Sequence, residues 1–184
     1  MDRLATWISR LFGAALLFLS GFVALETVLR KAFNTSLQGA DELGGYILAF
    51  GAAAAFTVAL IDRAHVRIDV LHRRFALSVQ AWIDLASVLS LGLLGLFFLY
   101  VGWGVIADTI AYKSTAATPW RTPLIWPQAA WYGALALFAV AALWLSLRAL
   151  MLVARGRIRQ VAAEFNPKSA EEELSEELDQ LHAR

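Results

Sequence analysis

Ionisable residues are rare within the long apolar stretches of this chain, and those that occur there are the first candidates for chemistry. Glu26 precedes Arg30 by four residues, a spacing that places both side chains on one face of a helix. An ionisable residue inside an apolar span is a functional candidate by default. Glu26 lies about one turn from the end of its span, where long charged side chains can reach water. We therefore interpret Glu26 as the group that neutralises Arg30.

The histidines are the residues that could bind a metal or haem. His65 and His72 are seven residues apart and can share one helix face, but the third histidine, His182, lies far away near the C-terminus. Metal sites need three or four converging ligands, and haem needs axial histidines inside the apolar spans. The chain has no cysteine, which excludes disulfides and thiolate sites. We expect no metal or other cofactor.

Catalytic and nucleic-acid-binding patterns are missing as well. The sequence contains no phosphate-binding glycine loop, no nucleophile–base pair and no cluster of carboxylates. It also lacks the inverted repeat with broken helices that is typical of self-sufficient secondary transporters. The sequence therefore predicts a protein that is not an enzyme and has no nucleic acid as a partner.

Composition identifies the class of protein. The chain is 59% hydrophobic and 17% charged, with a mean hydropathy of +0.60, whereas soluble domains carry more charge. Four uncharged or nearly uncharged stretches are each long enough to cross a hydrocarbon core of about 30 Å. They predict an all-α integral membrane protein with four transmembrane helices, at residues 11–29, 43–61, 85–107 and 129–153. We expect the first stretch to be retained as a span rather than cleaved as a signal peptide.

The segments that flank these spans suggest their ends. Asp41 and Glu42 open the second span, where acids suit the positive helix end and Asp41 can cap it. Asp84 is expected in the first turn of the third span. Between the second and third spans, apolar residues at helical spacing predict a short amphipathic helix in the membrane interface. These residues are Ile68, Leu71, Phe75, Val79 and Trp82.

Basic residues predict the orientation. Nine arginines lie in residues 1–10, 62–80 and 155–159, whereas only four basic residues lie in the other two connections. The positive-inside rule then places both termini in the cytoplasm. We predict a four-helix transmembrane domain over residues 1–159 and an acidic cytoplasmic tail over residues 160–184, where seven of the 15 acidic residues occur.

Several short motifs, in order and at matching spacing, resemble a known family. They are Leu29-Arg30 with Phe33-Asn34, Asp41-Glu42, His65-Val66-Arg67-Ile68-Asp69, and Thr118-Pro119-Trp120 with Pro127 and Gly133. Together they are similar to the DctQ-like small membrane subunit of tripartite ATP-independent periplasmic (TRAP) transporters. The resemblance covers the four-helix region and stops near Arg159.

The resemblance implies a role in secondary active transport. In such systems a periplasmic substrate-binding protein delivers an organic anion, such as a carboxylate, to a large membrane subunit that uses a sodium gradient for symport. The small subunit acts as a scaffold in the bacterial inner membrane. Its partners here would be that large subunit, the binding protein and the lipid bilayer. The candidate residues for subunit contacts or helix ends are Arg30, Asp41, Glu42, His65, Arg67, Asp69 and Pro119.

Two other functions stay open on the sequence. Glycine- and alanine-rich helix faces also permit an autonomous, homo-oligomeric four-helix exporter or channel. A membrane anchor subunit of an oxidoreductase would share the four-helix shape, although it would need histidines within the spans. The candidate residues could likewise serve only in capping and in setting topology.

Overall fold

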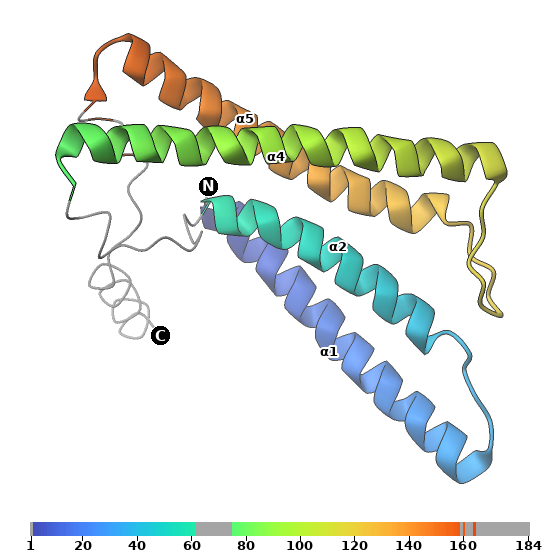
Figure 1. Ribbon diagram of the computed structural model, residues 1–184. Coiled ribbons are helices and arrows are strands. Elements are labelled where there is room, and N and C mark those ends of the chain that lie inside the picture. Colours follow the sequence, from blue (N-terminus) through green and yellow to red (C-terminus); the bar gives the residue numbers. More distant parts are fainter. Residues whose placement is uncertain (1, 62–74, 159, 161–163, 165–184) are drawn as a thin grey trace, which may run out of the picture.

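The computed structural model describes residues 2–61, 75–158, 160 and 164, and four long helices make up most of this part of the chain. They are α1 (Asp2–Phe33), α2 (Ala40–Ile61), α4 (Leu77–Tyr112) and α5 (Ile125–Ala154), shown in Figure 1. All four are long and apolar enough to cross a membrane. The prediction of an all-α protein with four spans is confirmed. Each helix extends beyond its predicted apolar stretch, because hydropathy marks only the part that suits hydrocarbon.

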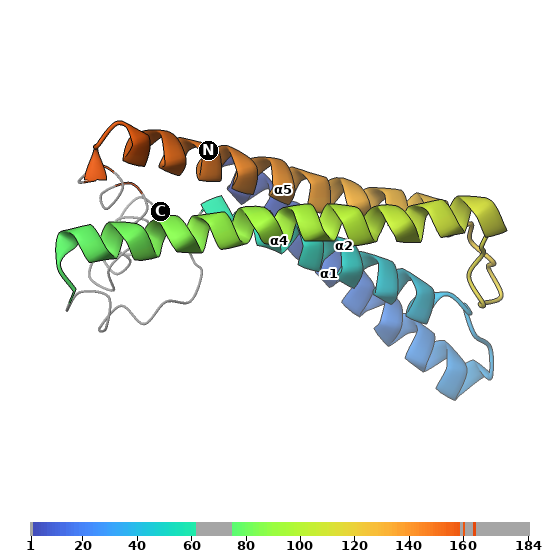
Figure 2. The same ribbon diagram turned by 45° about the horizontal axis from the view of Figure 1, so that its top comes forward.

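The helices form two antiparallel pairs. α1 packs against α2, α4 packs against α5, and the pairs meet through α2 and α5. In both views the α1–α2 pair is inclined to the α4–α5 pair, and the pairs diverge toward the α1–α2 and α4–α5 connections (Figures 1 and 2). We call this the loop end. At this end the connection between α4 and α5 reaches toward that between α1 and α2.

Small residues and aromatic rings fill the contact between the pairs. Ala53 and Ala54 of α2 lie in one buried cluster with Ala134 and Leu135 of α5. Phe138 of α5 is completely buried. The centroid of its ring lies 5.7 Å from the ring centroid of Phe56 in α2 and 6.5 Å from that of Phe98 in α4. Alanine allows backbones to approach closely, which is the usual means of helix association in lipid, and the rings join three of the four helices.

Glycines bring α4 and α5 into close contact. A Cβ added at Gly95 would lie 2.9 Å from Cα of Ala139, which is closer than such atoms pack, and one added at Gly102 would lie 2.8 Å from the ring of Tyr132. Between the two helices, the Ser146 hydroxyl donates a 3.0 Å hydrogen bond to the carbonyl of Val88. Close approach is what allows this side chain to reach the backbone of its neighbour.

Three predictions about helix ends need correction. Asp84 is not in a first turn, because α4 already begins at Leu77, and its side chain is fully buried. Ala76 has an extended backbone, so the predicted amphipathic pattern through Phe75 and Trp82 does not lie on one helix. The rest of that predicted helix falls outside the described residues.

Asp41 is also not the cap of α2. The carbonyl of Gly39 accepts the N–H of Leu43 at 3.0 Å, so Gly39 takes the capping position and Asp41 is an exposed residue within the first turn. Hydropathy and charge indicated that α2 begins near this acidic pair. They did not indicate which residue adopts the capping conformation.

The close contact between α4 and α5 predicts opposite effects for one substitution at two glycines of α4. Gly95→Ala forces its methyl group against the backbone of α5 and should lower the free energy of unfolding by about 1–3 kcal/mol. Gly104 faces open space, so Gly104→Ala should be neutral or stabilising by up to about 1 kcal/mol. Unfolding of both variants in mixed micelles measures the difference. Equal stability of the two would contradict the packing described.

Candidate functional site

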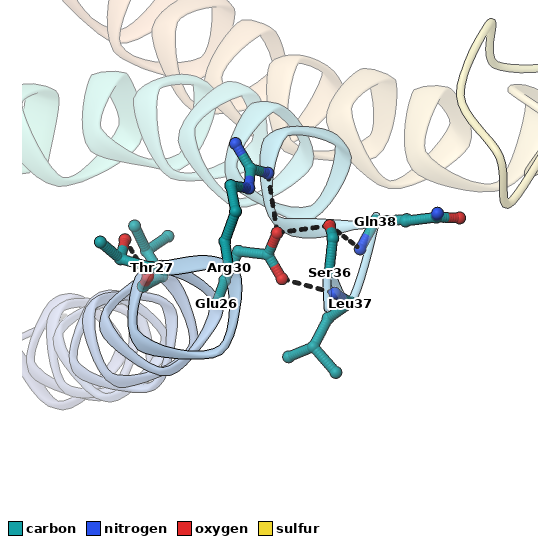
Figure 3. Close-up of polar contacts among 7 residues, drawn as sticks. Glu26, Thr27, Arg30, Ser36, Leu37 and Gln38 are labelled. Carbon is teal, nitrogen blue, oxygen red and sulfur yellow. Dashed lines mark hydrogen bonds and ion pairs between the residues drawn. The ribbon is translucent and has the colours of Figure 1, made fainter. Parts of the chain in front are cut away.

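The first polar site at the loop end is a cluster around Glu26. This carboxylate is 4% exposed and accepts a hydrogen bond from Arg30 at 2.7 Å, one helical turn along α1. From the connection that follows α1, the Ser36 hydroxyl donates to Glu26 at 2.6 Å and the N–H of Leu37 donates at 2.5 Å. Figure 3 shows Ser36 and Leu37 approaching the carboxylate from the connection while Arg30 approaches from the helix.

Our interpretation of Glu26 was therefore too narrow. The Arg30 side chain is 66% exposed, and an ion pair with so exposed a partner contributes about 0.2–1 kcal/mol. Ser36 and Leu37 add two donors from the connection, which a carboxylate with so little exposed surface needs. The main role of Glu26 is to hold the connection against the end of α1. The partners ten and eleven residues away could not be deduced from an i, i+4 spacing.

The second polar site, which we call the Glu42 junction, links the two helix pairs. Glu42 is 6% exposed and lies in the first turn of α2. One carboxylate oxygen accepts a 2.8 Å hydrogen bond from the Tyr46 hydroxyl, and the other accepts one from the Thr118 hydroxyl of the α4–α5 connection. Thr122 of the same connection also hydrogen-bonds Glu42 through its side chain and its backbone N–H. The positive end of the α2 dipole favours a negative charge there.

The α4–α5 connection is shaped to present these donors. Its two sides are joined by hydrogen bonds from Ala116 N–H to the Thr122 carbonyl and from Leu124 N–H to the Ser114 carbonyl. At its tip, the N–H of Arg121 bonds the carbonyl of Thr118 at 3.0 Å, which closes a turn with Pro119 in its second position. Proline is favoured there because its ring fixes φ near the value that the turn needs.

Trp120 completes the junction on the same turn. A Cβ added at Gly39 would overlap the indole of Trp120, so this ring packs directly on the backbone at the start of α2. Glycine at position 39 is therefore required for the contact.

Backbone strain is concentrated in the same two connections. Among the described residues, the non-glycine positions with positive φ are Asn34, Gln38, Lys113 and Arg121. This region costs about 1–2 kcal/mol for most L residues, and such residues persist only where the surroundings hold them. Asn34 and Lys113 are held by the hydrogen bonds that end α1 and α4, from the N–H of Thr35 to the carbonyl of Leu29 and from the N–H of Lys113 to the carbonyl of Thr109.

The structure brings together only some of the predicted site residues. Glu42 and Pro119 meet in one junction, and Arg30 belongs to the neighbouring Glu26 cluster. Asp41 is exposed on α2. His65, Arg67 and Asp69 lie outside the described residues, and their proposed contacts stay predictions. The donors Ser36, Tyr46 and Thr122 were missed, because common polar residues carry no signal until the fold places them beside a carboxylate.

No group of three or more metal-ligating side chains is found within the described part of the chain.

Comparison with known protein families gives a match for this chain. Residues 19–152, more than half of the chain, match the DctQ component of the tripartite ATP-independent periplasmic transporters. The chain belongs to this family. Neither the curated proteins nor the solved structures give a match.

As a DctQ component, the chain is the small membrane subunit of a TRAP transporter, a multi-pass protein of the inner membrane. The matched region contains all of the Glu26 cluster and all of the Glu42 junction. It ends within α5, before the acidic tail. The two buried carboxylates therefore belong to the part of the chain that the family shares.

The Glu42 junction predicts unequal effects for two adjacent acids. Glu42→Ala removes a buried acceptor of several hydrogen bonds and should lower the free energy of unfolding by about 1.5–3 kcal/mol. Asp41→Ala, at an exposed position of the same turn, should change it by less than about 0.5 kcal/mol. Unfolding in mixed micelles gives both values.

A double-mutant cycle identifies the partner. Thr118→Ala should have little further effect in the Glu42→Ala background, because its acceptor is already gone. Strictly additive effects would show that Thr118 and Glu42 do not interact in the folded protein.

Proposed function

We propose that this chain is the static scaffold subunit of a sodium-coupled TRAP transporter that takes up organic anions such as carboxylates. The large membrane subunit carries out the transport step, and a periplasmic binding protein supplies the substrate. The small subunit holds its partner in the membrane and binds neither substrate nor ion. Membership of the family supports assembly with the large subunit and the binding protein. The hydrogen bonds that the buried carboxylates accept from the chain itself support the scaffold role.

The buried carboxylates are the observation that carries this proposal. A transport site needs charged or polar groups that a solute or ion can reach within the membrane. Glu26 and Glu42 instead accept hydrogen bonds from the chain itself, at the loop end of the helices. Asp84 is fully buried and also interacts with another group. Glu26 and Glu42 hold the connections against the helices, and none of the three acids is open to solvent.

The lateral surface supports a role as a docking partner. Large apolar side chains are exposed along the described helices, among them Leu17 at 77% and Leu93 at 68%. In a bilayer such surface faces lipid or another membrane subunit. The interior is closed by alanine and phenylalanine packing, which suits a support better than a conduit.

Reconstitution tests the scaffold role. Proteoliposomes that contain this chain, the large subunit and the binding protein should accumulate a labelled carboxylate only under an inward sodium gradient. Omitting this chain should abolish uptake, because the large subunit then lacks its partner, and this chain alone should give none. Uptake by this chain alone would favour the exporter or channel hypothesis. The mass of the purified particle should fit one copy of each membrane subunit, whereas a homo-oligomer would contradict the proposal.

The proposed orientation puts both termini in the cytoplasm and the loop end in the periplasm, and cysteine labelling tests it. The chain contains no cysteine, so Ala117→Cys in the exposed α4–α5 connection and Gln160→Cys after α5 each introduce one thiol. A membrane-impermeant maleimide should label position 117 in intact spheroplasts and position 160 only after lysis. The reverse pattern would invert the proposed topology.

A further inference from the structure

Arg148 is a charged residue within the apolar helix α5, on the side of the helix that is exposed. It lies six residues before the end of α5, and its side chain is 51% exposed on the surface of the helix. A guanidinium on the lateral surface of a membrane span is costly unless it reaches the interface and finds an anion. In the structure that anion is Glu164, which follows α5 in the chain. The two form a bidentate pair, with 2.9 Å between Nε and one carboxylate oxygen and 3.0 Å between a terminal nitrogen and the other.

Arg148 belongs to a stripe of exposed residues on α5. Trp144, Arg148, Met151 and Arg155 follow one another by four, three and four residues, so they lie on one side of a helix with 3.6 residues per turn. Trp144 is 63% exposed, Met151 is 50% exposed, and Arg155 is exposed at the C-cap. The stripe therefore places apolar surface beside two guanidinium groups. Acyl chains contact the first kind of surface, and phosphate oxygens bind the second.

The level of the stripe in the bilayer suits a surface that combines apolar side chains with guanidinium groups. Trp82 and Trp103 on α4 are both well exposed and are 21 residues apart, which is about 32 Å along a helix and close to the hydrocarbon thickness. Such tryptophans mark the two interfaces. On α5, the ring of Tyr132 lies 6.5 Å from that of Trp103, so Tyr132 is at the same interface, and Arg148 follows it by 16 residues, about 24 Å. Arg148 thus lies inside the level of Trp82 by one to two helical turns, a distance over which a long basic side chain extends toward the headgroups.

We propose that the α5 stripe is a binding site for an anionic phospholipid. Arg148 and Arg155 bind the headgroup phosphate, and Trp144 and Met151 contact the acyl chains. In the absence of the lipid, Glu164 pairs with Arg148. Its carboxylate therefore competes with the lipid phosphate for this side chain. The competition is uneven, because an exposed ion pair is weak and phospholipid is abundant at this level of the bilayer.

The end of α5 supports a fixed geometry for the site. Gly156 has φ +69°, its N–H bonds the carbonyl of Val153 at 2.9 Å, and the N–H of Arg157 bonds that of Leu152 at 3.0 Å. This is the Schellman arrangement that ends many helices. Ile158 then packs against the buried cluster of α4 and α5 that includes Ala81 and Ala149. The chain after α5 turns back toward the helices, which is how Glu164 reaches Arg148.

Native mass spectrometry of the full chain tests the site. The protein is presented with equal amounts of phosphatidylglycerol and phosphatidylcholine that carry the same acyl chains. We expect a preference for phosphatidylglycerol of about fivefold or more, the ratio that one well-placed basic residue provides at an anionic surface. Arg148→Gln with Arg155→Gln should bring the two lipids near parity. Lys113→Gln with Arg121→Gln removes two exposed charges at the loop end and should leave the preference unchanged.

Glu164→Gln separates this proposal from simple charge attraction. Loss of the competing carboxylate should raise phosphatidylglycerol occupancy at limiting lipid, by more than Glu176→Gln, which removes one equal charge farther along the tail. Equal effects of Glu164→Gln and Glu176→Gln would show that Glu164 does not compete with the lipid for Arg148. Circular dichroism and thermal unfolding verify that all variants fold.

Three other outcomes would overturn the site itself. The first is a wild-type chain that binds both lipids equally, and the second is a double variant that keeps the preference. The third is displacement of the lipid by inorganic phosphate at equal concentration, which would indicate a site for free anions. In the complex with the large subunit the lipid should stay bound, whereas its loss would show that α5 contacts protein there.

Discussion

The burial of the Glu42 carboxylate is the constraint on which the loop end depends. A charged group removed from water is stable only when donors surround it, and within α2 the Tyr46 hydroxyl is a donor to Glu42. The remaining donors come from the α4–α5 connection, which lies seventy-six residues farther along the chain at Thr118. The two helix pairs are therefore joined at the point where they diverge (Figure 1). Gly39 and Trp120 seal the same contact by direct packing.

Within the membrane, packing has to replace the hydrophobic effect, because lipid is as apolar as the helices themselves. The chain meets this condition with alanines between α2 and α5 and with glycines between α4 and α5. The helices approach closely enough for the Ser146 hydroxyl of α5 to bond the carbonyl of Val88 in α4. A small TRAP subunit of this form is held together from within and leaves its lateral surface for lipid and partners.

The two ends of the molecule differ in their chemistry. At the loop end, buried carboxylates accept hydrogen bonds from the neighbouring connections. At the opposite end of α5, Arg148 and Arg155 are exposed on one side of the helix, and the chain turns back through Gly156. The first arrangement fixes the fold, and the second is suited to contact with the bilayer.

Sequence alone determined the four apolar helices, because an uncharged stretch of this length has no other stable state in a membrane. Its motifs also identified the family. Only the tertiary structure decided what Glu26 and Glu42 bind. Ser36, Thr118 and Thr122 are ordinary residues in the sequence, and their role depends on connections that meet only after the helices have packed. Spacing along a helix specifies neighbours one turn away, whereas contacts between loops are set by the helices that carry them.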